Sequence, residues 1–366
     1  MTATVTKAGP YYSSGSISFS SLRTNFKEAS SGSISASELR RNTTTTNTNP
    51  VVPDATENAS VSTSSNLALS QFRNTIKYYY ITQTGTDTNF DIDAQSWNNN
   101  LNKNILKWMY INGTCGSNST TLSAVDFNAT AYNLTLDVSG NIYGAGGAGG
   151  TLSTVSGGTG GNALTIASSG GNNIVIFVRS GAQIYAGGGG GEKGATGATG
   201  SNGTCGSYFY YSVGSGCEWC GSCGGGVQIG GCNGVSGCNC FIWCNNTQLA
   251  PAQCRGTNYY TVAGGVGGEG GNGGPGRGYN NQAGSLSGAS GNSGATGSCS
   301  GYDVTASTPG NGSQGETGGS GGEWATAGGN TNNTGNGGSS GRAITGSNYS
   351  VTGTINSDTV KGAYNP

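Results

Sequence analysis

Alternating apolar and polar positions predict short β-strands in the middle and near the end of this chain. Residues 134–144 and 174–187 each carry an alternating run, a Ser-Gly turn, a short Ile-Tyr strand and then glycines. We interpret both segments as hairpins or β-helical rungs that lead into a glycine-rich region. Residues 343–364 have the same alternating character and are expected to close the fold.

The apolar positions between residues 76 and 136 predict a small α+β module. Residues 76–82 (IKYYYIT) are typical of a strand, and residues 111–115 and 122–125 are expected to form shorter strands. Four further apolar residues lie at the spacing of one helix face: Trp97, Leu101, Ile105 and Trp108.

An eleven-residue pattern occurs three times before this module, at 15–25, 32–42 and 65–75. Each copy has an early apolar residue and, five positions later, an apolar residue followed by arginine: Ile17, Leu22 and Arg23; Ile34, Leu39 and Arg40; Leu67, Phe72 and Arg73. Candidate caps of one helical turn in each copy are Ser20, Ser37 and Ser70. So short a unit cannot bury its own apolar side. Residues 1–75 are therefore predicted to form an extended arm that docks on other proteins through these residues. The alternative is a disordered polar arm with chance similarity.

Glycine recurs at every third position in six runs between residues 144 and 341. Three residues per turn is the period of the polyproline II helix, and glycine on one side lets another backbone approach closely. We therefore expect a bundle of short polyglycine II helices that hydrogen-bond to one another. Collagen is disfavoured by only 7 prolines in the whole chain, and a flexible linker would need no fixed phase.

The composition excludes several classes of function. Only 8% of the residues are charged and the net charge is −1, unlike a polybasic nucleic-acid binder. The chain has no histidine, which removes Ser-His-Asp and Cys-His catalysis, and its acidic residues form no paired-carboxylate motif. We therefore expect a protein that is not an enzyme and has no cofactor. No apolar run suggests a membrane span or a signal peptide, so synthesis in a cytoplasm without Sec export is expected.

Nine of the 11 cysteines lie in a projecting insertion over residues 204–255: Cys205, Cys217, Cys220, Cys223, Cys232, Cys238, Cys240, Cys244 and Cys254. The overlapping CxxC spacings at 217–223 are compatible with a metal site. We favour a loop stapled by disulfides, in a protein that ends outside a reducing cytoplasm, with free thiols as the third possibility.

Aromatic residues collect in this insertion and in the other loops between glycine runs, which also carry Tyr259, Tyr260 and Tyr302. Aromatic side chains give large, rigid contact areas and stack on sugars. The candidate receptor-binding residues are Tyr208, Tyr210, Trp219, Phe241, Trp243, Tyr279 and Trp324. The alternative is that these rings pack on each other to hold the loops.

Runs such as GEKGATGATGSNG (191–203) and GGVGGEGGNGGPGRG (264–278) resemble the glycine-rich distal adhesins of T-even-type phage tail fibres. Separately, SGSISFSSLRTNF, FDIDAQSWN and VSGNIYGAGGAGG resemble virion structural proteins of marine and cyanobacterial tailed phages. The first resemblance implies a tip domain that is a sandwich of polyglycine II helices, with receptor-contacting loops. It points to residues 204–255, 279–282 and 323–327.

Together the resemblances imply a virion tail-fibre or tail-tip component, made in the host cytoplasm. It would dock on other tail proteins by its N-terminus and bind a host surface glycan or outer-membrane protein, with no nucleic-acid partner. By analogy it would be a homo-oligomer, a trimer. The alternative is a purely structural virion protein, such as a baseplate component or capsid decoration. The expected fold is mainly irregular and β, with a docking arm (1–75), an α+β module (76–136) and a glycine-rich domain (137–366).

Overall fold

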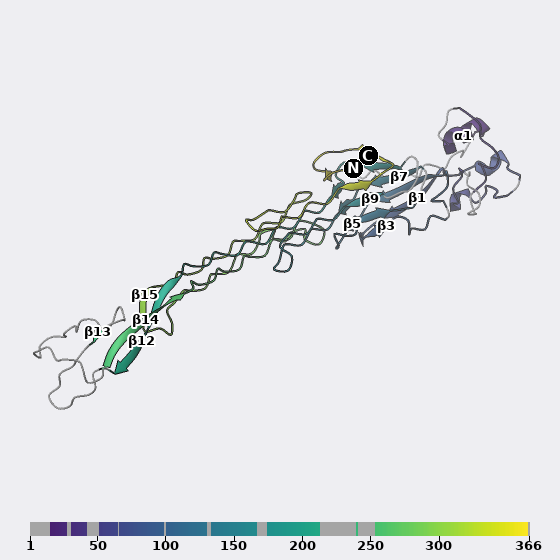
Figure 1. Ribbon diagram of the computed structural model, residues 1–366. Coiled ribbons are helices and arrows are strands. Elements are labelled where there is room, and N and C mark those ends of the chain that lie inside the picture. Colours follow the sequence, from purple (N-terminus) through teal and green to yellow (C-terminus); the bar gives the residue numbers. More distant parts are fainter. Residues whose placement is uncertain are drawn as a thin grey trace, which may run out of the picture. The chain divides into compact units, whose positions relative to one another are not determined.

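The computed structural model describes residues 15–27, 31–41, 51–64, 66–98, 100–129, 133–166, 174–212, 239–240 and 253–364 (Figure 1). These residues are mostly strands and irregular segments, as the sequence predicts. Their short helical elements are α1 (Phe19–Lys27), η1 (Thr56–Asn58) and η2 (Leu69–Phe72). The chain divides into two compact units. The first is Met1–Lys193, Asn272–Ala289 and Gly318–Pro366, and the second is Gly194–Gly271 and Ser290–Thr317.

Three parallel sheets among the described residues of the first unit are the faces of a β-helix. The first sheet has the order β1 (Tyr78–Gln83), β4 (Leu106–Ile111), β7 (Leu134–Val138), β10 (Ile174–Val178) and β17 (Tyr349–Gly353). The second has the order β18 (Val360–Lys361), β11 (Gln183–Tyr185), β8 (Asn141–Tyr143), β5 (Thr114–Gly116) and β2 (Thr86–Thr88). The third has the order β16 (Ile344–Gly346), β9 (Leu164–Ile166), β6 (Val125–Phe127) and β3 (Phe90–Asp91). The chain visits the sheets in turn, so each circuit adds one rung. The sequence was compatible with either hairpins or β-helical rungs at 134–144 and 174–187. The parallel pairing of their strands shows that they are rungs.

The interior of the β-helix is a set of apolar ladders, because residues in register on successive rungs stack on one another. One ladder joins the second-sheet residues Cys115, Ile142, Ile184 and Val360. Another joins the first-sheet residues Met109, Leu136, Ile176 and Val351. These side chains belong to one buried cluster, except that of Val351, which is partly buried and packs against it, and they account for the alternating sequence pattern. The predicted strands in residues 343–364 are confirmed as β16, β17 and β18.

The helix predicted through Trp97 and Trp108 is wrong. Residues 106–111 form strand β4, in which Lys107 and Met109 are buried and alternate with less buried neighbours. Asn98 has a φ of 48°, in the left-handed region, which would interrupt an α-helix. The helical spacing arose because buried turn residues happen to precede a strand whose period is two.

The other strand predictions for this region are close to the observed elements. Residues 76–82 largely coincide with β1. A strand over 111–115 is wrong, because β4 ends at Ile111 and β5 begins at Thr114. The strand predicted at 122–125 begins only at Val125. The residues between these observed strand ends form the corners of the β-helix.

The glycine runs form extended segments that are hydrogen-bonded at every third residue. In the second unit, the Gly197 amide donates to the Gly268 carbonyl (2.8 Å) and the Gly268 amide to that of Ser313 (2.9 Å). The Ser313 amide returns to the Ala198 carbonyl (2.9 Å), which closes a triangle of three segments. The links recur three residues away, from Gly194 to Gly271. This is the hydrogen-bond pattern expected of packed polyglycine II helices.

The first unit repeats this arrangement with other segments. The Gly191 amide donates to Gly274, the Gly274 amide to Gly319 and the Gly319 amide to Glu192, each at 2.8 Å. Within this unit the glycine segments leave the β-helix between its second and third sheets. One glycine-rich segment connects β8 to β9, and a longer one connects β11 to β16. Both segments therefore leave the β-helix at the same corner, on two successive rungs.

Candidate binding surfaces

An antiparallel sheet in the second unit holds the base of the cysteine-rich insertion. Its order is β13 (Asn239–Cys240), β14 (Gln253–Val262), β12 (Gly203–Ser212) and β15 (Val304–Ser307). Strands β12 and β14 pair along their whole length, from Gly203 opposite Val262 to Ser212 opposite Gln253. The insertion therefore begins and ends in two paired strands of ten residues each. Glycine segments lead directly into β12 and out of β14.

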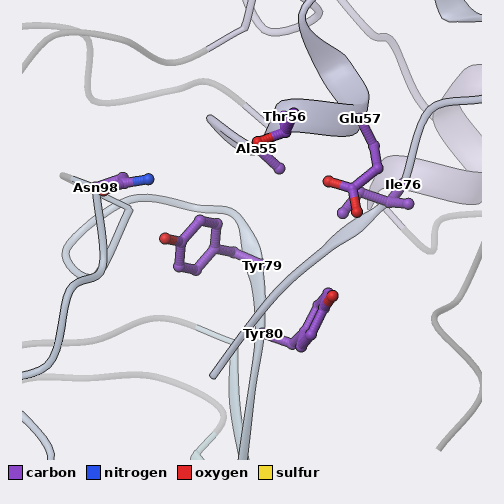
Figure 2. Close-up of a pocket in the computed structure, with 7 residues that line it drawn as sticks. All are labelled: Ala55, Thr56, Glu57, Ile76, Tyr79, Tyr80 and Asn98. Carbon is purple, nitrogen blue, oxygen red and sulfur yellow. The ribbon is translucent and has the colours of Figure 1, made fainter. Parts of the chain in front are cut away.

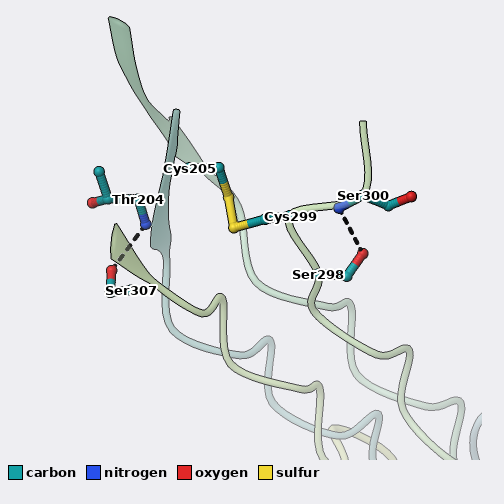
Figure 3. Close-up of a disulfide and its surroundings, with 6 residues drawn as sticks. All are labelled: Thr204, Cys205, Ser298, Cys299, Ser300 and Ser307. Carbon is teal, nitrogen blue, oxygen red and sulfur yellow. Dashed lines mark hydrogen bonds between the residues drawn. A yellow bond between two sulfur atoms is a disulfide. The ribbon is translucent and has the colours of Figure 1, made fainter. Parts of the chain in front are cut away.

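A disulfide fastens this sheet to a neighbouring loop. Cys205 in β12 is bonded to Cys299, 94 residues away, with their Cα atoms 5.5 Å apart (Figure 3). The same picture shows the Thr204 amide donating to the Ser307 hydroxyl at 2.9 Å, which ties β12 to β15. The sheet is therefore held at one end by both a covalent link and a side-chain hydrogen bond.

The cysteine that pairs with Cys205 lies outside the range in which its partner was expected. We expected its partner, or a metal, within 205–254, and the structure places the partner outside the insertion. The odd number of nine cysteines there was the available signal, because one of them had to pair elsewhere or stay single. Cys240 and Cys254 are opposite each other in the register of β13 and β14. Their side chains, with Cys217, Cys220, Cys223, Cys232, Cys238 and Cys244, lie outside the described residues, so disulfides there remain a prediction.

Three tyrosines are exposed on the stapled sheet and its adjoining loop. Tyr259 is 56% exposed, Tyr260 46% and Tyr302 37%. The rings of Tyr260 and Tyr302 have centroids 5.8 Å apart and are tilted by 42°. The Tyr302 amide donates to the Cys299 carbonyl at 3.0 Å, so the disulfide holds the loop that carries this ring. We call these three exposed residues the tyrosine patch, in which the Tyr260 and Tyr302 rings share one face, whereas Tyr259, the neighbour of Tyr260 in β14, lies on the other face of the sheet.

Of the predicted receptor-binding residues in this region, Tyr208 is half-buried in β12, where its amide donates to the Asp303 carboxylate at 2.7 Å. Tyr210 lies in the same strand, with its side chain outside the described residues. Trp219, Phe241 and Trp243 also lie outside them. The structure therefore places Tyr208 in the sheet that carries Tyr259 and Tyr260, and leaves the other four as predictions.

Trp324 and Tyr279 belong to the first unit and pack against its β-helix. Trp324 stacks on Tyr143, with centroids 5.0 Å apart, and lies 5.7 Å from the Tyr185 ring. The Tyr279 ring packs directly on Gly116, because a Cβ built on that glycine would be only 2.2 Å from the ring. These contacts fit the alternative interpretation that some loop aromatics hold the structure together.

An ion pair also orients the loop that carries Trp324. Arg277 makes two hydrogen bonds to the Glu323 carboxylate, at 3.0 and 3.1 Å. These bonds lower the pKa of Glu323 and raise that of Arg277. Since the Glu323 side chain is 62% exposed, solvent weakens the pair and its main effect is to orient the turn.

The three N-terminal repeats pack together in the first unit. Leu22 and Leu39 are completely buried and Phe72 is 1% exposed, in one cluster against which Ile17, Ile34 and Leu67 also pack. Each repeat thus buries the apolar side of the others. The prediction that these apolar residues contact other proteins is corrected here, because their side chains are used within the chain. Docking of this module, residues 15–76, by its outer surface remains a prediction.

The arginines link one repeat to the start of another. Arg23 donates to the Gly32 carbonyl at 2.7 Å, and Arg73 donates to the Gly15 carbonyl at 3.1 Å. The Arg40 Nε is buried and lacks a hydrogen-bond partner within the described ranges, and residue 65, the equivalent acceptor, lies outside them. Two head-to-tail links between repeats are therefore observed among the described residues.

The helix caps are two residues earlier than predicted. The Ser18 hydroxyl accepts from the Ser21 amide (3.1 Å), and the Ser35 hydroxyl accepts from the Glu38 amide (3.3 Å). The Glu38 carboxylate accepts in return from the Ser35 amide at 2.7 Å, a capping box. The assignments of Ser20, Ser37 and Ser70 are therefore wrong, and the Ser35-x-x-Glu38 spacing was the missed signal. In the third repeat the capping position is Ala68, whose amide donates to the Gln71 side chain.

One acidic residue of the glycine region is buried rather than exposed to solvent. Glu192 is completely buried, and its Oε2 accepts from the Thr331 amide at 2.6 Å. Across the described ranges, no group of three or more His, Cys, Asp or Glu side chains is placed to hold a metal ion. None of the described helices is long and apolar enough to cross a membrane.

Comparison with known proteins finds a likeness among solved structures. No model of a protein family matches the chain, and no curated protein matches it. A solved structure with some likeness is the crystal structure of the gp37-gp38 adhesin tip complex of the bacteriophage S16 long tail fiber. The likeness covers 82% of this chain and 88% of that chain, with 19% sequence identity and a TM-score of 0.36. A TM-score this low does not establish a common fold.

Proposed function

We propose that this chain is a phage tail-fibre or tail-tip component that attaches by its N-terminal module and binds the host cell surface by its second unit. The observation that carries this is the tyrosine patch. Tyr260 in β14 and Tyr302 in the loop joined by the disulfide expose a pair of aromatic rings, and Tyr259 exposes a third ring on the other face of the same sheet. Rigid exposed aromatics lose little entropy on binding, which suits them to recognition.

The bundle of glycine segments that leads into β12 and out of β14 is a second argument for this role. The glycine segments of the second unit are joined by backbone hydrogen bonds such as Gly268 to Ser313. These bonds join backbone atoms of the glycine segments themselves, so the strands and loops at the ends of the segments can change without altering the scaffold. The sequence resemblance to glycine-rich distal adhesins points in the same direction.

The N-terminal module is proposed to attach the chain to the rest of a tail fibre. Three similar repeats share one core, and head-to-tail bonds from Arg23 to Gly32 and from Arg73 to Gly15 link them, so the module offers three similar surfaces to a partner. Such a surface matches the end of an assembly of three identical chains. One copy of this chain would then cap one trimeric partner, which differs from the homotrimer expected by analogy. Mass photometry of the chain mixed with candidate fibre proteins tests this, and a stoichiometry of one to three is expected.

The proposed mechanism is binding without catalysis. Each contact made by the tyrosine patch is expected to be weak, and several copies on one virion would combine into strong attachment. Host surface glycans and outer-membrane proteins are both compatible with exposed tyrosines. The rival is a structural virion protein whose patch touches another virion protein.

The deciding experiment measures binding of the full chain to intact candidate host cells, with phage adsorption in competition. Saturable binding that blocks adsorption, and that is lost in a Tyr259→Ala, Tyr260→Ala, Tyr302→Ala triple variant, would support the proposal. Tyr364→Ala serves as the matched control, because this tyrosine packs on the β-helix core of the first unit. A folded chain that binds no host, together with incorporation into virions, would favour the structural rival.

A further inference from the structure

The outer face of the β-helix carries a second group of aromatic rings. Tyr78 and Tyr80 in β1 and Trp108 in β4 alternate with residues that face the interior, and Tyr80 is opposite Trp108 in the register. The Trp108 ring meets Tyr78 edge-on, at 5.4 Å and 87°, and stacks on Tyr110 at 5.7 Å and 19°. Tyr78, Tyr80 and Trp108 are each half-buried. We call these three residues the rung platform.

The orientation of Trp108 is fixed by a buried ion pair. Its indole N–H donates to the Asp137 carboxylate at 3.1 Å. Asp137 is itself completely buried and accepts two hydrogen bonds from Arg179, both at 2.6 Å. A buried carboxylate is stable only when it is paired in this way. The ring is therefore held in place before any ligand arrives, which lowers the entropy lost on binding.

A polar cavity of ≈ 230 Å³ opens beside the rung platform. Figure 2 shows η1 on one side of it and the rings of Tyr79 and Tyr80 on the other. The full lining is Ala55, Thr56, Glu57, Ile76, Tyr79, Tyr80 and Asn98. It offers hydroxyl, carboxylate and amide groups, so both donors and acceptors are present. Tyr80 belongs both to the cavity lining and to the rung platform, so the two adjoin at this residue.

We propose that this surface binds a saccharide, with a pyranose ring lying on the rung platform and its hydroxyl groups reaching into the cavity. A pyranose has an apolar C–H face that packs on aromatic rings and an edge of hydroxyls that both donate and accept. The mixture of fixed aromatic rings and uncharged hydrogen-bonding groups such as Thr56 and Asn98 matches both parts. A purely apolar ligand would leave the polar cavity groups dehydrated, and an anion would approach the Glu57 carboxylate. The site is in the first unit, so it stands independently of the tyrosine patch.

The test is saturation-transfer difference NMR on the full chain with methyl α-glucoside, methyl α-galactoside, methyl α-mannoside and N-acetylglucosamine. We expect saturable transfer to at least one of these sugars. Tyr80→Ala and Thr56→Ala are each expected to weaken it about tenfold, equal to about 1.4 kcal/mol. Tyr260→Ala, in the tyrosine patch, is the matched control and should leave the signal unchanged. Trp108→Phe keeps a ring but loses the N–H bond to Asp137, and is expected to weaken binding without unfolding the chain.

Circular dichroism of each variant separates loss of binding from loss of fold. If none of the four sugars gives a signal with the folded chain, the proposal is overturned. It is also overturned if a sugar binds equally well to the parent chain, Tyr80→Ala and Thr56→Ala. If these variants instead lose incorporation into virions while no sugar binds, the surface is a protein contact and the saccharide assignment fails.

Discussion

The carbonyl oxygen of Asn292 lies where the side chain of residue 268 would begin if that residue were not glycine. A Cβ built on Gly268 would be 2.0 Å from this oxygen and 2.7 Å from the carbonyl carbon. At Gly197 a Cβ would be 2.2 Å from the carbonyl oxygen of Ser313. These contacts are too short for unbonded atoms, so the spacing of three in the sequence is a steric requirement of the bundle.

Replacement of Gly268 by alanine is therefore expected to destabilise the second unit by more than about 3 kcal/mol, because backbone cannot move aside as a side chain can. Thermal unfolding and soluble yield would measure the effect. The control is Gly329→Ala, where the nearest atom to a new Cβ is the Ser320 amide nitrogen at 3.2 Å. This change should cost less than about 1 kcal/mol. Equal stability of the two variants would contradict the bundle.

The disulfide between Cys205 and Cys299 gives a second prediction. Mass spectrometry without reductant is expected to find the two cysteines in one linked peptide pair. Cys299→Ser should lower the stability of the second unit by about 2–5 kcal/mol, as loss of a native disulfide commonly does. It should also weaken any host binding by the tyrosine patch, because Tyr302 hydrogen-bonds to residue 299. Full alkylation of both thiols in the oxidised protein would refute the pairing.

Lys107 gives a prediction for pH dependence. Its ammonium group donates to the carbonyl oxygens of Lys103 and Ile105, both at 2.7 Å, inside the first rungs. Burial lowers the pKa of Lys107 to about 7, whereas an unfolded lysine has a pKa of about 10.4. Between these values the unfolded chain binds more protons than the folded one, so stability should rise with pH from about 7 to about 10 and be flat below.

Urea unfolding at a series of pH values, followed by Trp fluorescence, would show this slope. The total gain should be a few kcal/mol at most, since one pKa unit corresponds to about 1.4 kcal/mol. Lys107→Met removes the titrating group and should remove its share of the slope. The matched control is Lys361→Met, which replaces a lysine that is only half-buried and should keep the slope. A parent chain with no slope in this window would disprove the assignment.

The N-terminal repeats give a fourth prediction. Leu39→Ala removes a completely buried side chain from the cluster shared by the three repeats and should cost about 2–5 kcal/mol. Phe19→Ala, in the same module, is the control, because Phe19 is 55% exposed. Hydrogen exchange over residues 15–76 would report the difference. If both variants exchange at the parent rate, the repeats do not form a common core.

The parts of the fold that the sequence predicted are those with a strict local period. Glycine at every third position indicated the bonded segments, because the backbone contacts at Gly268 allow no other residue. The alternating runs at 134–144 and 174–187 indicated strands, because only every second residue of a strand faces the core. Whether these strands formed hairpins or rungs depended on pairing between distant residues, such as Ile142 with Ile184, which a local pattern does not contain.

The parts that were missed depend on contacts between segments far apart in the chain. Trp108 was assigned to a helix because its distance from Trp97 fits one, although it lies in a strand that pairs with β1 and β7. Cys299 was left out because it lies outside the insertion. The repeats were expected to act singly, whereas Leu39 is buried in one cluster with Leu22 and Phe72 of the other two repeats.

The triangular hydrogen bonding of the glycine segments also limits how this protein can change in length. An insertion of one or two residues in a segment would move every following amide off its acceptor, while three residues restore the match. Segments bonded to each other, such as those of Gly197, Gly268 and Ser313, must lengthen together. Growth of the bundle is therefore quantised in whole triplets added to several segments at once. Related chains should differ in these segments by multiples of three residues, with other length changes confined to the turns.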